Sequence, residues 1–529
     1  MILTNRIFVG LSFIAVVAAL ILAAANLYLG DLNQDEGWYL YAAGLVSSGQ
    51  WPYVDFAFTQ GPVMPLVYAL FQSGLGRTGG LAGGRLITAL LGLAGAVLAA
   101  RLAARLVNTE LRAGAALTTF ILISVNVYQS YFCTVVKTYS LTVLLLMLGF
   151  LALAEGWTRR RAWLLLMAGA FMVLAAGTRT SAGVILPIVF LYLLMARRSA
   201  PPLAWLHFGL GATVTAGLVF LPFLILAPES FMYCIVKYHT LRYSGGGLMT
   251  LAFKVGFLSR LLQAYFVAFG IGIAVVFAKW AGDRHAPAAT AITNPSVGPA
   301  LMRMLWLSVI TITLIHFLAP FPYDDYQVFI FPLLAIAIAS AAVRLVGQRG
   351  SLWLTMAILV VSLGAAGSSP LNQDWFIQGR DRIWWIVKDR SPLQKLRDTA
   401  ARIRSITKPG DLLLTQDPYL AVEANLKVPR GLEMGQFSYF PNLNDDQAER
   451  LHVFNRAGFE RLLRTTEAPI AALSGYALAI QSPEVTPLTP EDQALFTKIV
   501  MDRYTPMTNV PSFGQAGTTL KIYRKKAGM

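Results

Sequence analysis

Residues 7–30 read IFVGLSFIAVVAALILAAANLYLG, and the acidic stretch DLNQDE follows at once at residues 31–36. The apolar run has 24 residues and no charge, so it is long enough to span a bilayer, which takes about 20 apolar residues in a helix. It is also longer than the apolar core of a secretory signal, which has roughly 7–15 residues. We therefore interpret it as an uncleaved membrane anchor with the acidic stretch at its far end.

The composition extends this interpretation to the whole chain. Of its 529 residues, 56% are hydrophobic and 13% are charged, whereas about a quarter of the residues in a soluble protein are charged. An ordinary soluble enzyme is therefore excluded. The two cysteines, Cys133 and Cys234, are too few for a disulfide framework, a zinc site or an iron–sulfur cluster.

The pattern of apolar runs predicts a mainly α, polytopic membrane protein with about eleven transmembrane helices. The approximate limits of these helices are 7–30, 83–106, 114–132, 138–154, 162–178, 181–196, 203–226, 258–280, 304–320, 327–345 and 351–367. They make up a membrane domain over residues 1–369, with a long first outer loop at 31–82. No internal repeat is evident, which weakens the case for a transporter built from two related halves.

Residues 370–529 have the composition of a soluble protein and predict a second, smaller α/β domain. Its expected helices are 392–405, 445–464 and 490–502, and its expected strands are 411–416, 469–473, 476–481 and 518–524. The charges in the short loops predict where this domain lies. With a cytoplasmic N-terminus, the inner loops hold fourteen basic residues against three acids, and the outer loops before residue 369 hold eight against seven. The C-terminal domain is then outside.

The first outer loop carries the strongest local signal. Asn33 followed by Glu36 resembles a capping box and predicts a helix from this point to about Ser47. Its apolar face, which includes Trp38, suits a helix lying on the membrane surface. Asp35 is then in the first turn at the boundary between water and lipid. Acids at this end of a helix also offset the helix dipole, so a purely structural role for Asp35 and Glu36 is the alternative.

Several short motifs, in this order along the chain, resemble GT-C glycosyltransferases, and in particular the group of protein O-mannosyltransferases and lipid A aminoarabinose transferases. The motifs are Asp35-Glu36 with Tyr39, Pro52-Tyr53-Val54-Asp55-Phe56, Thr59-Gln60-Gly61-Pro62, Gly177-Thr178-Arg179-Thr180 and Tyr323-Asp324-Asp325-Tyr326. The resemblance implies a multi-pass protein of the bacterial inner membrane. It also implies inverting transfer of a sugar from a polyprenyl-phosphate donor to a glycolipid, polysaccharide or protein acceptor on the outer face.

The chemistry of this reaction assigns roles to the acidic and basic residues. A hydroxyl acceptor needs a carboxylate to take its proton, and we assign this role to Asp35. Glu36 and Asp55 are expected to orient the loop or the acceptor. The departing lipid phosphate needs cations where its charge develops. The candidates for this role are Arg179, Lys237 and Arg242. Arg179 can alternatively extend from a helix end to water, and the loop that carries Lys237 and Arg242 can alternatively bind anionic lipid.

The acceptor or another part of the substrate is expected to contact Gln60, Tyr323, Asp324 and Tyr326. Related enzymes often carry an acid just before the Pro-containing turn, where this chain has Phe58-Thr59-Gln60, so a second catalytic carboxylate is not assigned. No cofactor is certain. A divalent metal held by Asp35 with Asp324 and Asp325 is one possibility, and contacts from these aspartates to the acceptor are another.

Two other functions remain open at this stage. One is a flippase or transporter of a lipid-linked sugar, for which charged residues near the middle of the bilayer are typical. The other is a catalytically idle membrane protein that binds glycans. The C-terminal domain shows no nucleophile–base pair and no phosphate-binding glycine motif, so we expect it to recognise the acceptor or to stabilise the membrane domain.

Overall fold

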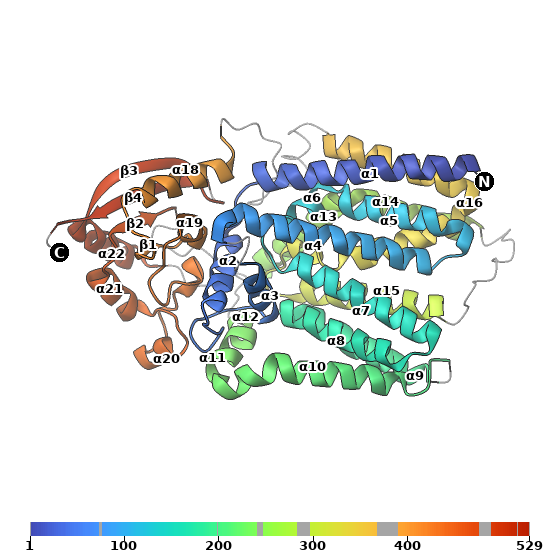
Figure 1. Cartoon of the computed structure of the whole chain (residues 1–529), viewed down its shortest axis with the longest axis horizontal. Helices are drawn as coiled ribbons and strands as arrows, with labels where there is room; N and C mark the ends of the chain where they lie inside the picture. The colour runs from blue at the N-terminus through green and yellow to red at the C-terminus, as the bar shows by residue number, and fades with distance from the viewer. Residues whose placement is uncertain are drawn as a thin grey trace.

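The computed structural model describes residues 2–72, 77–197, 199–240, 247–282, 297–367, 390–475, 488–515 and 517–527. Figure 1 shows a bundle of roughly aligned helices with the C-terminal elements gathered at one end. The N-terminus of the chain lies at the opposite end of the bundle. Residues 368–389, which contain the expected domain boundary near residue 370, lie outside the described part of the chain.

The membrane part consists almost entirely of helices, as the apolar runs predict. Its α-helices are α1 (Ile2–Leu29), α2 (Gln34–Ser47), α3 (Val63–Phe71), α4 (Arg77–Arg105), α5 (Arg112–Ser124), α6 (Val127–Phe132), α7 (Tyr139–Arg159), α8 (Ala162–Thr178), α9 (Ile185–Met195), α10 (Ala204–Leu226), α11 (Pro228–Met232), α12 (Tyr238–Thr240), α13 (Gly247–Ala264), α14 (Phe266–Gly282), α15 (Val297–Leu318) and α16 (Phe331–Gly367). Short 3-10 or π turns are η2 (Thr109–Leu111), η3 (Thr180–Val184), η4 (Tyr233–Lys237) and η5 (Asp324–Gln327).

Six of the described helices are long and apolar enough to cross a membrane, or seven if α13 and α14, which are bent by 88°, form one span. This confirms a multi-pass membrane fold but not the predicted number of eleven spans. The expected span at 114–132 is two helices, because the Asn126 side chain accepts a hydrogen bond from the Gln129 amide and begins α6. The expected spans at 327–345 and 351–367 form α16, which breaks at Gly347 with a φ of 68°.

The C-terminal part has the mixed α/β character that its sequence predicts. Its helices are α18 (Pro392–Arg404), α19 (Pro418–Ala424), η6 (Gly435–Ser438), α20 (Asp445–Arg450), α21 (Arg456–Thr465) and α22 (Pro490–Arg503). Its strands are β1 (Leu413–Thr415), β2 (Ile470–Leu473), β3 (Tyr504–Phe513) and β4 (Thr518–Lys525), in the order β1-β2-β4-β3. β1 and β2 are parallel, and the other two pairs are antiparallel.

The described C-terminal elements differ from the predicted ones in two places. The expected helix at 445–464 is interrupted, because the Asn455 side chain caps a new helix, α21. Strand β3, which contains Pro506 and Pro511, was not predicted. Among the described strands it is the last in the order and pairs with β4 alone. Proline is tolerated in an edge strand. The expected strand at 476–481 lies outside the described residues.

Helix α2 lies between the membrane helices and the C-terminal part (Figure 1). Its prediction from the capping box is confirmed, because it begins after Asn33 and the Glu36 carboxylate accepts a hydrogen bond from the Asn33 amide at 3.0 Å. The prediction that its apolar face lies on the membrane surface is wrong. Trp38 is only 5% exposed, and the Tyr41 hydroxyl accepts a hydrogen bond from the Val428 amide at 3.0 Å. The C-terminal domain covers this face.

Candidate active site

A buried ion pair fixes the start of α2. The Arg85 guanidinium of α4 contacts both carboxylate oxygens of Glu36 at 2.7 Å, and neither side chain is exposed. Arg85 also donates hydrogen bonds to four backbone carbonyl oxygens at or near the end of α1. These belong to Asn26, Leu27, Gly30 and Asp31. These contacts connect α1, α2 and α4 at the start of the first outer loop.

Asp35, the neighbouring residue, points into a different environment. Its side chain is 23% exposed. The indole nitrogen of Trp38 donates to its Oδ1 atom at 3.3 Å, and the ammonium of Lys137 lies 3.1 Å from its Oδ2 atom. The carboxylate is thus held by two donors and is still reachable from outside the protein. Burial, reinforced by the charge of Asp35, raises the pKa of Tyr39, which keeps that phenol neutral.

Lys137 joins Asp35 to a second carboxylate that comes from a distant part of the sequence. Its ammonium lies 2.7 Å from Oδ2 of Asp325, which also accepts a hydrogen bond from the Tyr139 hydroxyl at 2.8 Å. Burial raises the pKa of Asp325, but the charge and hydrogen bond of Lys137 and the charge of Arg179 outweigh this, so the pKa lies below its usual range. Asp325 is therefore ionised at neutral pH.

Arg179 lies in the break between α8 and η3, close to this cluster. Its side chain donates to Thr138 Oγ1 at 3.1 Å, and its guanidinium lies over the rings of Tyr139 and Tyr326 at 4.7 and 4.5 Å. It is only 7% exposed, so it does not extend to water. Its Nε atom is buried without a hydrogen-bond partner in the described part of the protein. Such a donor is costly to leave unpaired, which makes this a suitable place for an anion.

The structure therefore brings Asp35, Arg179 and Tyr326 into one cluster. The sequence analysis did not identify Lys137 as a member of this cluster. One signal was present, because the loop charges predict that Lys137 is a cation on the outer side, where basic residues are less frequent. Asp325 was considered as a metal ligand or as a contact to the acceptor, but not as a partner of Lys137.

The other predicted site residues take part in different contacts. Asp55 accepts a hydrogen bond from the Trp51 amide at 2.7 Å within its own loop. The carbonyl oxygen of Gln60 accepts a hydrogen bond from the Tyr53 hydroxyl. Lys237 is exposed, with its ammonium 6.0 Å from the centre of the Tyr233 ring. Arg242 lies outside the described residues.

Tyr323 and Asp324 directly precede Asp325 and Tyr326 at the start of η5. The Tyr323 ring packs against Tyr326 at 5.3 Å. Asp324 pairs with Arg260 of α13 at 2.7 Å and accepts a hydrogen bond from the Tyr128 hydroxyl at 2.5 Å. Among the residues that the structure describes, no three His, Cys, Asp or Glu side chains are arranged to hold a metal ion. Asp35 and Asp325 instead share the ammonium of Lys137, and Asp324 pairs with Arg260.

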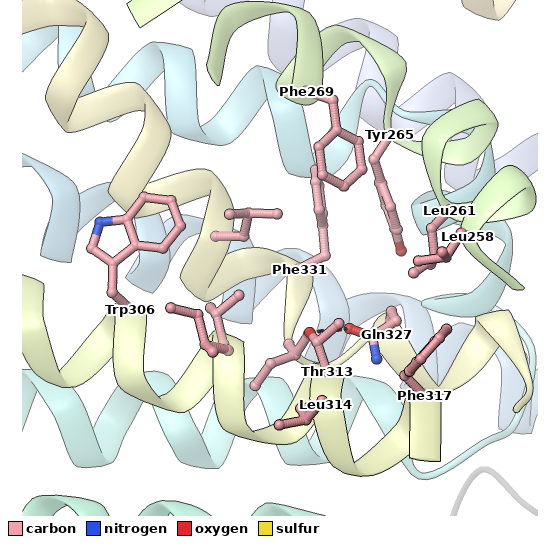
Figure 2. Close-up of a pocket in the computed structure, with 14 residues that line it drawn as sticks. Leu258, Leu261, Tyr265, Phe269, Trp306, Thr313, Leu314, Phe317, Gln327 and Phe331 are labelled. Carbon is pink, nitrogen blue, oxygen red and sulfur yellow. Dashed lines mark hydrogen bonds between the residues drawn. The ribbon is translucent and has the colours of Figure 1, made fainter. Parts of the chain in front are cut away.

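An apolar cavity of about 520 Å³ opens beside this segment, between α13, α14, α15 and α16. Figure 2 shows its wall of aromatic and aliphatic side chains, including Tyr265, Phe269, Trp306, Phe317 and Phe331. Its polar lining includes Gln327, whose Oε1 accepts a hydrogen bond from the Thr313 hydroxyl at 2.9 Å (Figure 2). Gln327 is in η5, two residues after Asp325, so the cavity begins next to the charged cluster.

No protein-family model matches the sequence, and no curated protein matches it. Solved structures share its fold. ArnT from Cupriavidus metallidurans, in crystal structures with undecaprenyl phosphate and without it, matches with TM-scores of 0.58 and 0.59 at 16% and 17% identity. These matches cover 98% and 97% of this chain and 98% of ArnT. The oligosaccharyltransferase of Archaeoglobus fulgidus matches with a TM-score of 0.53 at 10% identity. The match covers 99% of this chain and 74% of the oligosaccharyltransferase chain. The chain therefore has the fold of ArnT and of this oligosaccharyltransferase, in agreement with the multi-pass membrane fold expected from the sequence.

Proposed function

We propose that this protein is an inverting membrane glycosyltransferase. It transfers a sugar from a polyprenyl-phosphate donor to a hydroxyl of a glycolipid, polysaccharide or protein acceptor. The observation that carries the proposal is the cluster itself. A partly exposed carboxylate, Asp35, belongs to the same cluster as a buried arginine, Arg179, that has an unpaired donor atom. The apolar cavity reaches Gln327, two residues after Asp325 of this cluster.

Asp35 serves as the general base. In the transition state the acceptor oxygen attacks the anomeric carbon, and its proton passes to the Asp35 carboxylate. A base of this kind contributes about 100-fold or more to the rate when it lies within hydrogen-bond reach of the proton. The contacts from Trp38 and Lys137 keep the carboxylate in one orientation, and its exposed fraction gives the acceptor access.

Arg179 binds the leaving group. As the bond between the anomeric carbon and the phosphate oxygen breaks, the electron pair remains on the phosphate, whose negative charge grows. A buried guanidinium stabilises such a charge more strongly than an exposed one, because little water screens the interaction. The unpaired Nε of Arg179 supports this role. Lys237 and Arg242 remain proposed as additional contacts to the phosphate from the outer loop.

The apolar cavity suits the hydrocarbon chain of the donor. Ligand cavities are mostly lined by aromatic and aliphatic side chains with a small number of polar groups, and this cavity has such a lining. The ArnT structure that shares the fold was determined with undecaprenyl phosphate bound, which supports a donor of the same chemical class here. Gln60, Tyr323, Asp324 and Tyr326 are proposed to contact the sugar or the acceptor, with Asp55 supporting the loop.

The orientation follows from the loop charges. We propose that the protein resides in the bacterial inner membrane with its N-terminus in the cytoplasm and its C-terminal domain in the periplasm. The bundle has its N-terminus and its C-terminal domain at opposite ends (Figure 1), which supports this arrangement. The covered face of α2 supports a stabilising role for the C-terminal domain.

The test is a transfer assay with purified protein, radiolabelled polyprenyl-phosphate sugars and a membrane extract as the source of acceptors. Asp35→Asn should lose about 100-fold or more of the transfer rate and keep its affinity for the donor, because only the proton acceptor is removed. Asp446→Asn, at an exposed acid in α20, is the matched control and should transfer normally. Equal turnover by Asp35→Asn and wild type would refute the assignment of the base. Movement of labelled lipid across vesicles without transfer would favour a flippase.

A further inference from the structure

The ammonium of Lys137 has an arrangement that is typical of a bridging metal ion. It lies between two carboxylates, 3.1 Å from Asp35 and 2.7 Å from Asp325. These two acids come from segments almost three hundred residues apart, and Lys137 comes from a third segment, just before α7. The side chain of Lys137 is only 8% exposed, so its attraction to both carboxylates is weakly screened by water.

Two aromatic rings pack near the ammonium of Lys137 and limit its position. The ammonium is 5.2 Å from the centre of the Phe132 ring and 5.7 Å from that of Tyr139. Tyr139 also donates to the same oxygen of Asp325 that Lys137 contacts. Without a cation between them, two carboxylates in a partly buried site repel each other, so the ammonium of Lys137 holds the two groups together.

We propose that Lys137 is a positioning residue that occupies the place of a divalent cation between Asp35 and Asp325 and thereby keeps the Asp35 carboxylate correctly oriented. The catalytic part of this inference depends on the proposed function, whereas the part about cation binding does not. Removing the lysine should convert the two carboxylates into a site that accepts another cation.

Two measurements on the full-length protein in detergent test this. The first is binding of Mn²⁺, followed by electron paramagnetic resonance. Wild type should show no Mn²⁺ site that depends on Asp35, and Lys137→Ala should gain one that is lost again in the double variant Lys137→Ala/Asp325→Asn. The second is transfer activity. Lys137→Ala should lose about 100-fold, and added ethylamine should restore part of the loss, because its ammonium fits the space left by the side chain. Activity of wild type should be unaffected by EDTA.

Lys525→Ala, which removes a lysine paired with the exposed Glu467 in the C-terminal domain, is the control and should behave as wild type in both measurements. A wild-type Mn²⁺ site that disappears in Asp35→Asn would overturn the inference. So would full activity of Lys137→Ala, or a loss of activity that neither ethylamine nor Mn²⁺ reverses. If Lys137→Ala does not fold, Lys137→Met, which keeps the contacts with the two rings, replaces it in both measurements. If wild type transfers no sugar from any donor, the proposed function fails, but the Mn²⁺ measurement still decides whether Lys137 takes the place of a cation.

Discussion

Replacing Glu36 with glutamine should destabilise the protein far more than its conservative chemistry suggests. The change keeps the shape of the side chain and removes its charge. The Arg85 guanidinium then remains fully buried with no carboxylate at 2.7 Å. Its hydrogen bonds to the carbonyl oxygens at the end of α1 remain, but neutral acceptors do not balance a buried charge. Breaking a buried ion pair in this way costs about 3–5 kcal/mol, a large part of a typical unfolding free energy of about 5–15 kcal/mol.

The measurement is chemical denaturation in detergent, followed by tryptophan fluorescence. The matched control is Glu460→Gln, which removes one partner of the exposed pair with Arg464 in α21. That pair is separated by one helical turn and should contribute only about 0.3–0.5 kcal/mol. Asp35→Asn is a second comparison. Because Asp35 is partly exposed and Lys137 keeps its 2.7 Å contact with Asp325, this change should lower the unfolding free energy less than Glu36→Gln does.

The reasoning would be refuted if Glu36→Gln and Glu460→Gln lowered the unfolding free energy by the same small amount. Arg85 would then have to be neutralised by something other than Glu36. It would also be refuted if Asp35→Asn were as destabilising as Glu36→Gln, because the two neighbouring acids would then share one structural role.

Two further changes test other parts of the structure. Arg179→Met should weaken binding of a polyprenyl phosphate by about 10- to 100-fold, since a hydrogen bond to a charged group contributes roughly 1.5–3 kcal/mol. The control is Arg390→Met, at an exposed ion pair. Unchanged affinity of Arg179→Met for the lipid would leave Arg179 a purely structural role. Burial raises the pKa of Asp417 to about 6 and that of Glu433 to about 7. The folded state therefore holds more protons than the unfolded state, whose pKa values are about 3.9 and 4.3, so the free energy of unfolding should fall as the pH rises from about 4 to about 7. Glu433→Gln should flatten this slope in denaturation curves measured across that range, and a rise over the same range would contradict the assignment.

The sequence was most informative where a structure depends on residues close together in the chain. The start of α2 is an example, because Asn33 and Glu36 satisfy each other's backbone within a single helical turn. The apolar runs likewise located most of the helices, since an apolar stretch of the right length has few alternatives in lipid. These signals need no knowledge of the rest of the fold.

The candidate site was harder to predict from the sequence, because it depends on contacts between distant segments. Nothing near Lys137 in the sequence indicates that it meets both Asp35 and Asp325. The surface position expected for α2 failed for the same reason. Its apolar face is covered by the C-terminal domain through contacts such as that between Tyr41 and Val428, and an amphipathic pattern does not distinguish a membrane surface from a protein surface.

The adjacent acids of α2 show how one short segment can serve both stability and chemistry. Consecutive residues on a helix point about 100° apart, because a turn has 3.6 residues. Glu36 consequently faces α4 and Arg85, whereas Asp35 faces Lys137. The ion pair on one side fixes the rotation of the helix about its axis, and that rotation sets the direction of the Asp35 carboxylate on the other. A change at Glu36 that leaves the protein folded should therefore still reduce transfer by misdirecting Asp35, even though Glu36 itself never touches the reacting groups.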